Sequence, residues 1–211
     1  MDKVKTALLR FQNEVFPKHR TVYERLATSQ HPETLFIGCS DSRVMPNDIL
    51  QAGAGELFIC RNAGNIVPPH GDVLGGVSGT VEYAVQVLKV KRIIVCGHSD
   101  CGAMKALLHP EKVAQYRAVS HWLRHADRVA PIVRELHGDD LSEAEFLSRL
   151  IEENVIAQLE NLTTHPWVAA KVRAGAVVLH GLVIDIATGT FRMLDLEKKT
   201  WQTLTSEGIP A

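Results

Sequence analysis

The sequence predicts a single α/β domain over residues 1–211, with a mostly parallel central sheet, an antiparallel edge hairpin, flanking helices and an N-terminal helical arm. Three observations predict this fold. Short apolar strand patterns alternate with helical patterns, which is typical of a parallel sheet. The last two strand patterns are separated by "ATGT", a hairpin signal that makes this edge antiparallel. Residues 2–28 carry apolar side chains at helical spacing before the first strand begins.

The first half of the chain supplies most of these patterns. In the arm, Pro17 should divide the helical pattern into two helices. Strands are expected at 34–39, 56–63 and 92–98. Helices are expected at 80–90, after a Gly-rich segment at 71–79, and from about Ala103.

The second half begins with a helix-start signal. Ser142 and Glu145 form a capping-box pattern ahead of a long helix that runs through Leu162. A short helix is expected after Pro166. The strands at 176–186 and 190–196 then form the predicted hairpin.

Composition excludes several classes of function. The 23 Lys and Arg residues balance 24 Asp and Glu residues, so no basic excess favours binding to nucleic acid or to a membrane surface. Apolar runs fall far short of the ~20 residues of a membrane span. The N-terminus lacks the apolar core of a signal peptide, so we expect a cytoplasmic protein. There, four cysteines favour metal binding or free thiols over disulfides.

Three candidate metal ligands stand at the ends of predicted strands or just beyond them. Cys39 ends the first strand, His98 ends the third, and Cys101 follows three residues later. Functional groups gather at the carboxyl ends of parallel strands. Two thiolates and an imidazole suit zinc, and three protein ligands leave the fourth position open, as in a catalytic site.

Asp41 and Arg43 follow Cys39 at alternate positions. In an extended segment, alternate side chains point to the same face, so the three groups would project together. An ionised carboxylate only accepts hydrogen bonds, and a guanidinium can hold it through two parallel bonds. A structural salt bridge at the strand end is the alternative interpretation of this pair.

The two motifs together resemble a known family. "CSDSR" at 39–43 and "HSDCG" at 98–102, with "RNAGNIVPP" at 61–69 and "ENVIAQLENLTTHP" at 153–166, resemble bacterial β-class carbonic anhydrases, including those encoded alongside cyanate degradation. The resemblance implies one Zn²⁺ per chain, with Cys39, His98 and Cys101 as ligands. It makes Asp41 and Arg43 the catalytic dyad, with Asp41 binding the metal only in a closed state.

The function that this resemblance implies is the reversible hydration of carbon dioxide to bicarbonate and a proton by metal-bound hydroxide. The positions of the family's substrate pocket are occupied by Gln30, Phe58, Ala63, Tyr83 and Gly102. Because part of that pocket comes from a neighbouring subunit in this family, a homodimer or a dimer of dimers is expected. The arm at 2–28 should pack on the partner, because its apolar stripe needs a surface to cover.

Two other functions remain open at this point. Hydrolysis of COS or CS₂ uses the same zinc hydroxide on related folds, and a zinc protein without turnover belongs to a different class.

A regulatory feature of some family members is expected to be missing. Their second bicarbonate pocket uses a Trp, an Arg and a Tyr, where this chain has Phe36, Arg61 and Ile184. Phe and Ile donate no hydrogen bond to an anion. The open state with Asp41 paired to Arg43 should therefore dominate, with Arg61 in a structural ion pair.

Cys60 and Cys96 should be buried thiols.

Overall fold

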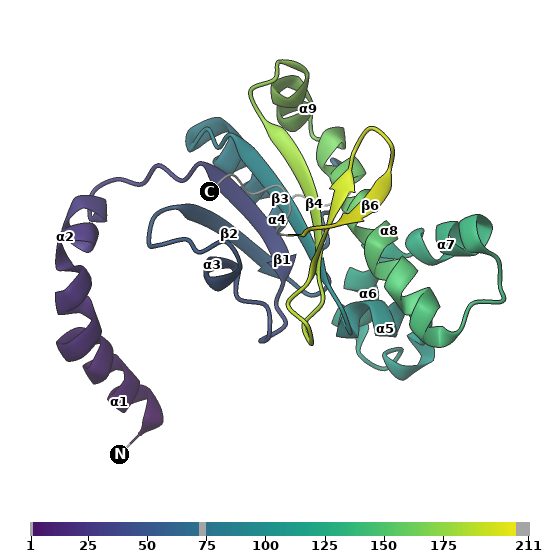
Figure 1. Cartoon of the computed structure of the whole chain (residues 1–211), viewed down its shortest axis with the longest axis horizontal. Coiled ribbons are helices and arrows are strands. Elements are labelled where there is room, and N and C mark those ends of the chain that lie inside the picture. The colour runs from purple at the N-terminus through teal and green to yellow at the C-terminus, as the bar shows by residue number, and fades with distance from the viewer. Residues whose placement is uncertain (1, 72–74, 206–211) are drawn as a thin grey trace.

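The computed structural model describes residues 2–71 and 75–205, and its centre is a six-stranded sheet (Figure 1). The strands are β1 (Thr34–Cys39), β2 (Leu57–Asn62), β3 (Arg92–His98), β4 (Val178–Ile184), β5 (Phe191–Asp195) and β6 (Thr200–Thr203). Their order is β2-β1-β3-β4-β5-β6. The first four are parallel, and β5 and β6 continue the sheet in antiparallel fashion. The predicted parallel sheet with an antiparallel edge is confirmed, and β6 is an addition that we did not predict.

The register brings three strand ends to one edge of the sheet. β1 lies between β2 and β3, with Cys39 opposite Asn62 and Gly38 opposite Cys96. β3 runs two residues further, to His98. The side chains that follow β1, β2 and β3 therefore meet at the same place, as expected for parallel strands.

Helical segments connect the strands and cover the sheet (Figure 1). They are α1 (Lys3–Arg10), η1 (Phe11–Val15), α2 (Phe16–Leu26), α3 (Pro46–Ile49), α4 (Gly76–Glu82), η2 (Tyr83–Val87), α5 (Gly102–Leu108), η3 (Pro110–Lys112), α6 (Arg117–Leu123), η4 (Arg124–Ala126), α7 (Val129–His137), α8 (Glu143–Thr164) and α9 (Pro166–Arg173). The long helix α8 starts with the predicted capping box, in which Ser142 and Glu145 bond each other's backbone amides.

The core divides between the two faces of the sheet. Side chains alternate along each strand, so Leu35 and Ile37 join the large cluster beneath the helices, whereas Phe36 joins a smaller cluster on the other face. Helix α8 approaches the sheet closely at Gly97. A Cβ atom there would lie 3.0 Å from Val155 Cγ2. This close packing fixes α8 relative to the end of β3.

The arm is continuous through the proline that was predicted to divide it. Its two α-helical segments are joined by the π-helical turn η1, and Pro17 lies in the first turn of α2. The amide of Phe16 donates to the carbonyl of Phe11, five residues back. Proline has no amide hydrogen and its ring clashes with the carbonyl four residues earlier, and the wider turn relieves that conflict without ending the helix.

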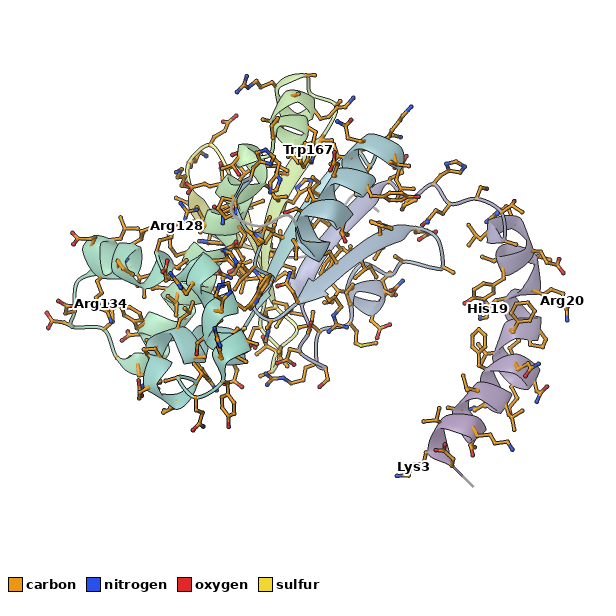
Figure 2. All side chains as sticks on the ribbon, turned by 180° about the vertical axis from the view of Figure 1, so that it is seen from behind. Lys3, His19, Arg20, Arg128, Arg134 and Trp167 are labelled. Atoms are coloured by element: carbon orange, nitrogen blue, oxygen red, sulfur yellow. The ribbon has the colours of Figure 1, made fainter. Side chains whose placement is uncertain are left out.

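Most of the arm stands clear of the sheet and its helices (Figures 1 and 2), and Leu26 near its end approaches Gly55. None of the residues of α1, η1 and α2 is buried. Val4 is 63% and Leu8 is 64% exposed, and the rings of Phe11 and Tyr23 pack edge to face with centroids 6.1 Å apart. Among residues 2–71 and 75–205, the apolar stripe of the arm therefore has no covering surface. Among the described residues, no helix is long and apolar enough to cross a membrane.

Candidate metal centre

Two cysteines and one histidine converge at the carboxyl edge of the sheet. The ligand atoms of Cys39, His98 and Cys101 lie within 4.8 Å of one another, and all three residues are buried. Cys39 closes β1, His98 closes β3, and Cys101 caps the start of α5. The predicted group is thus brought together by the parallel arrangement of two strands.

The imidazole of His98 is oriented for metal binding. Its Nδ1 lies 2.9 Å from the carbonyl oxygen of Ser99, which can only accept a hydrogen bond, so Nδ1 carries the proton. In the neutral imidazole, Nε2 is then the nitrogen with a free lone pair. It is fully buried and has no hydrogen-bond partner. A buried nitrogen that faces two thiols and lacks a partner fits a zinc ligand.

The two thiols are electrostatically linked. The hydrogen bond with Cys101 is the main cause that lowers the pKa of Cys39 to about 4, and His98 and the amides of Gly64 and Asp41 add to it. The pKa of Cys101 is raised, chiefly by the same contact with Cys39 and then by burial. The pair therefore carries one proton, which a cation bound by both sulfurs has to displace.

The loop after β2 supplies an amide to the first thiolate. The N–H of Gly64 donates to Cys39 Sγ at 3.4 Å. Gly64 has φ +82°, and a Cβ atom there would lie 2.9 Å from the Cβ of Ala103. Only glycine combines this backbone conformation with such a close approach to α5. The glycine within "RNAGN" was a signal for this contact that our sequence analysis did not use.

Buried polar side chains of α8 hold the same loop. Asn154 Nδ2 donates to the Gly64 carbonyl at 3.0 Å, Gln158 Oε1 accepts from the Val67 amide at 2.9 Å, and Asn161 Nδ2 donates to the Val67 carbonyl at 2.8 Å. Their spacing at 154, 158 and 161 puts all three on one helix face. We call these three residues the α8 amide ladder. It fixes the loop that donates to Cys39.

The segment after Cys39 is a turn, and not the extended chain from which we argued. β1 ends at Cys39, and the amide of Val44 donates to the carbonyl of Asp41 at 3.0 Å. The side chain of Asp41 also accepts from the amide of Arg43 at 3.0 Å. Asp and Asn commonly form such local turns because a short polar side chain can reach the backbone two residues on. The turn, rather than strand alternation, sets the positions of Asp41 and Arg43.

Within this turn, Arg43 grips Asp41 through two hydrogen bonds. Nε donates to Oδ1 at 2.9 Å and Nη2 donates to Oδ2 at 2.8 Å. The hydrogen bonds from Arg43 are the largest cause that lowers the pKa of Asp41 below its usual range. Its carboxylate stays ionised at neutral pH and only accepts hydrogen bonds. Oδ2 also lies 4.0 Å from His98 Nε2, which places the carboxylate beside the ligand atoms.

Arg61 has a different role from the ion pair that we expected. Its Nε donates to the Cys39 carbonyl at 2.9 Å and its Nη2 donates to the Asp41 carbonyl at 2.6 Å. Both acceptors are backbone oxygens of the ligand turn. Phe36 is fully buried in the smaller apolar cluster, and Ile184 is partly buried against that cluster. Arg61 therefore braces the turn that carries Cys39 and Asp41. Phe36 and Ile184 contribute apolar side chains to the smaller cluster.

The predicted substrate-pocket residues fall at two separate ends of the sheet. Ala63 and Gly102 lie beside the ligands, where the Ala63 carbonyl accepts from Trp122 Nε1 at 2.8 Å and Gly102 begins α5. Gln30 precedes β1 and therefore lies beyond its opposite end, and a strand of six residues spans about 17 Å.

Phe58 and Tyr83 belong to that opposite end as well. Phe58 stands near the start of β2, and its ring stacks on Tyr83 with centroids 5.8 Å apart. Gln30 and Tyr83 line a groove of about 660 Å³ together with Leu26, which comes from α2. None of the three metal ligands lines this groove. Within one chain, Gln30, Phe58 and Tyr83 are thus separated from the metal centre.

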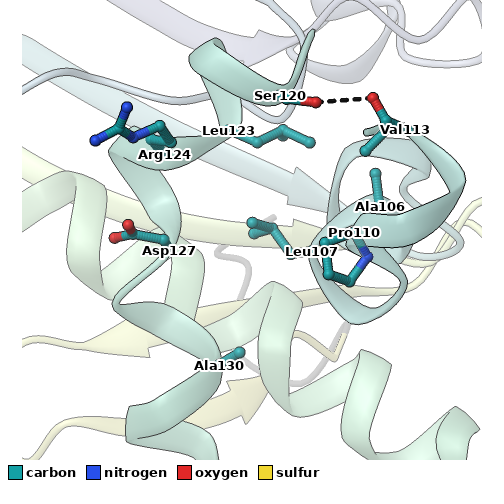
Figure 3. Close-up of a pocket in the computed structure, with 9 residues that line it drawn as sticks. All are labelled: Ala106, Leu107, Pro110, Val113, Ser120, Leu123, Arg124, Asp127 and Ala130. Carbon is teal, nitrogen blue, oxygen red and sulfur yellow. Dashed lines mark hydrogen bonds between the residues drawn. The ribbon is translucent and has the colours of Figure 1, made fainter. Parts of the chain in front are cut away.

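A second cavity is also separate from the metal centre. About 230 Å³ in volume, it lies between α5, α6 and α7 and is lined largely by aliphatic side chains such as Leu107 and Leu123 (Figure 3). The hydroxyl of Ser120 donates to the Val113 carbonyl at 2.7 Å across it. Neither the ligands nor the Asp41–Arg43 pair lines this cavity.

The arrangement at the sheet edge can therefore bind a borderline-soft cation and present a fixed hydrogen-bond acceptor next to it. Three protein ligands leave a coordination position open for water or substrate. The acceptor is held by an arginine from its own turn. This combination is suited to directing an oxygen nucleophile at a small electrophile.

Comparisons with known proteins agree with this chemistry. A family model described as carbonic anhydrase matches residues 34–191, which include Cys39, His98, Cys101 and the Asp41–Arg43 turn. A carbonic anhydrase from Pseudomonas aeruginosa is 51% identical over 187 residues, covering 89% of this chain and 84% of the relative.

Solved structures give the same answer at the level of the fold. The β-carbonic anhydrase CcaA superimposes with a TM-score of 0.91 at 37% identity, covering 96% of this chain and 98% of that one. One of two tetrameric β-carbonic anhydrases from Sordaria macrospora gives a TM-score of 0.79 at 28% identity, covering 96% and 97% of the two chains.

Proposed function

Because this chain belongs to the β-class carbonic anhydrases, it catalyses the zinc-dependent reversible hydration of carbon dioxide to bicarbonate and a proton, and we propose that Cys39, His98 and Cys101 hold its zinc ion. The observation that carries this assignment is the convergence of their three ligand atoms, with the unpartnered His98 Nε2 among them. Zinc bound there supplies a Lewis acid that brings the pKa of water down to about 7.

Asp41 orients the attacking oxygen in this proposal. Its ionised carboxylate can only accept, so it selects the oxygen that still carries a hydrogen and turns a lone pair of that oxygen towards carbon dioxide. Its position 4.0 Å from His98 Nε2 supports this role.

Arg43 keeps Asp41 available for that task. Its two hydrogen bonds occupy both carboxylate oxygens from the side of the turn. Without them, the carboxylate could swing onto the metal and block the open position. Such a closed state is disfavoured here because Phe36 and Ile184 offer no donors for a second bicarbonate at the neighbouring apolar cluster.

The full substrate site is proposed to need two chains. Gln30, Phe58 and Tyr83 lie at the end of the sheet away from their own metal centre, so a partner must supply them to complete an apolar wall with one polar group. The uncovered stripe of the arm, residues 2–28, offers the surface for such a partner. A homodimer or a dimer of dimers would complete the substrate site and cover the arm. Tetrameric relatives support the larger assembly.

We place the enzyme in the cytoplasm. All four cysteines are free thiols, and two of them, Cys60 and Cys96, are buried in strands away from the ligands. A reducing compartment keeps Cys39 and Cys101 available as metal ligands. Carbonic anhydrase relatives favour carbon dioxide as the substrate over COS or CS₂, and over a zinc protein without turnover.

Replacing one thiolate tests the ligand assignment. Cys101→Ser exchanges a soft thiolate for a poor zinc ligand, so the purified variant should contain little zinc and lack carbon dioxide hydration. The matched control is Cys96→Ser, which changes a buried cysteine that is not a ligand and should keep its zinc. Zinc content is measured by elemental analysis and hydration by stopped-flow. Full zinc and full activity in Cys101→Ser would refute the assignment.

A further inference from the structure

Arg43 is held by two different loops. Besides its bonds to Asp41, its Nη1 donates to Asp100 Oδ2 at 3.1 Å and its Nη2 donates to the Asp100 carbonyl at 3.3 Å. Asp100 lies on the turn between β3 and α5, flanked by the ligands His98 and Cys101. The guanidinium therefore bridges the turn that follows Cys39 and the turn that carries the other two ligands.

Asp100 is itself anchored. Its second oxygen, Oδ1, forms an ion pair with the ammonium group of Lys105 on α5. Its backbone is in the left-handed region, with φ +59°, which Asp, Asn and Gly tolerate better than other residues. The four side chains form a row of alternating charge, Asp41–Arg43–Asp100–Lys105.

The turn that carries Asp100 restricts a joint movement of Asp41 and Arg43 that their own turn allows. Asp41 and Arg43 share one turn, so their mutual bonds do not stop them from moving together. Arg43 is 43% exposed, and an arginine side chain has several rotatable bonds to order. The contacts with Asp100 tie its guanidinium to the loop that holds two of the ligands, and Lys105 prevents Asp100 from turning away.

We propose that Asp100, seated by Lys105, is a positioning residue that holds Arg43 in place and so keeps the Asp41 carboxylate off the metal. It touches neither substrate nor ligand atoms and acts through Arg43. The inference rests on the proposed function, because it assumes that Asp41 works only when it is not a ligand.

The experiment uses two variants that weaken the row at different points. Asp100→Gly removes the carboxylate and keeps a residue that accepts positive φ. Lys105→Met removes the anchor without touching the turn. The controls are Asp139→Gly and Lys198→Met, which delete matched charges from exposed pairs elsewhere, Arg134–Asp139 and Lys198–Asp195. Each protein is loaded with zinc for stopped-flow assays and with cobalt for visible spectroscopy.

Both site variants should keep one metal per chain and lose carbon dioxide hydration by about threefold or more, since exposed charge pairs contribute modestly. Their cobalt spectra should shift towards that of a carboxylate-ligated centre, and crystal structures should show Asp41 on the metal in part of the molecules. Lys105→Arg should restore the parent spectrum. The Asp139→Gly and Lys198→Met controls should match the parent chain.

A double variant separates positioning from general destabilisation. In an Arg43→Ala background, Asp100→Gly should add nothing to the spectral change, because both act through the same guanidinium. Parent-like spectra in both Asp100→Gly and Lys105→Met would overturn the inference, as would additive effects in the double variant. The proposed function fails separately, if Asp41→Asn with full zinc hydrates carbon dioxide at the parent rate. If Asp100→Gly loses its metal, the spectra of Lys105→Met and Lys105→Arg still test the inference.

Discussion

The proton shared by Cys39 and Cys101 links metal binding to pH. The pKa of Cys39 is lowered to about 4, mainly by its hydrogen bond with Cys101, which favours the thiolate at this sulfur. The pKa of Cys101 is raised by the same contact, so it holds the proton that must leave when zinc binds.

This arrangement predicts the sign of the pH dependence. Loss of a proton on binding means that zinc affinity rises with pH and falls as pH decreases, by about tenfold per unit for one proton. Competition with a chelator over a pH series measures the affinity of the zinc-depleted enzyme. Calorimetry in buffers of different ionisation enthalpy counts the protons released. A zinc affinity that does not change with pH would contradict the linked thiol pair.

Single residues also show where the sequence was informative. Cys39, His98 and Cys101 could be predicted because each stands at a strand end or one turn beyond it, and strand ends can be located from apolar patterns. The contacts of Gly64, Asp100 and Arg61 could not, because each depends on how two loops approach after folding. The spacing of residues in the sequence does not give the distance between two loops in the folded chain.

At the scale of elements, α8 connects the core with the metal loop. Its aliphatic side chains pack on β3 and β4, and its amide ladder, Asn154, Gln158 and Asn161, bonds the loop that follows β2. The helix therefore transmits the position of the sheet to the amide of Gly64, which donates to Cys39.

Removing one rung of the ladder should weaken both stability and metal binding. Asn154→Ala leaves the buried Gly64 carbonyl without its partner, which should lower the free energy of unfolding by about 1–3 kcal/mol. Zinc affinity should fall as well, since the Gly64 amide is no longer held against Cys39. Denaturant melts measure the free energy of unfolding, and competition with a chelator measures the zinc affinity.

The control lies on the exposed side of the same helix. Thr163→Ala removes a side chain that bonds only the backbone of its own turn, and it should change the unfolding free energy by about 0.5 kcal/mol or less. Equal losses in Asn154→Ala and Thr163→Ala, with zinc affinity unchanged in both, would mean that the ladder does not support the metal loop.

The strands and α8 were predictable because their patterns are long or well capped. β6, α6 and α7 were not predicted. β6 is a four-residue edge strand, Thr200–Thr203, with no apolar alternation to indicate it. α6 is only seven residues long and lacks a side-chain cap, so its stability comes from packing on neighbours. The π-turn in the arm arises from a local compromise around Pro17 that propensities do not describe.

At the scale of the whole molecule, each active site should combine two chains. The metal centre belongs to the carboxyl edge of one sheet, and Gln30 belongs to the opposite end. If a partner supplies Gln30, then two chains with different defects should complement each other. Cys101→Ser provides a sound Gln30 without metal, and Gln30→Ala provides a metal centre without Gln30.

Co-refolding these two variants in equal amounts should recover about a quarter of the parent activity, because half of the dimers are mixed and each has one intact site. Mixing Cys101→Ser with Asp41→Asn is the control, since both defects then lie at the metal centre and no intact site forms. Equal activity in the two mixtures would show that Gln30 serves its own chain or none. Light scattering establishes that both mixtures contain dimers or larger assemblies.

The most direct test of the central claim is the rate of carbon dioxide hydration by zinc-loaded Asp41→Asn. The amide is nearly the same size as the carboxylate, but it donates as well as accepts, so it no longer selects the orientation of the attacking oxygen. With one zinc ion per chain, the variant should turn over about 100-fold more slowly than the parent at neutral pH. Turnover within a few-fold of the parent, at the same zinc content, would contradict the assignment of Asp41 as the orienting acceptor.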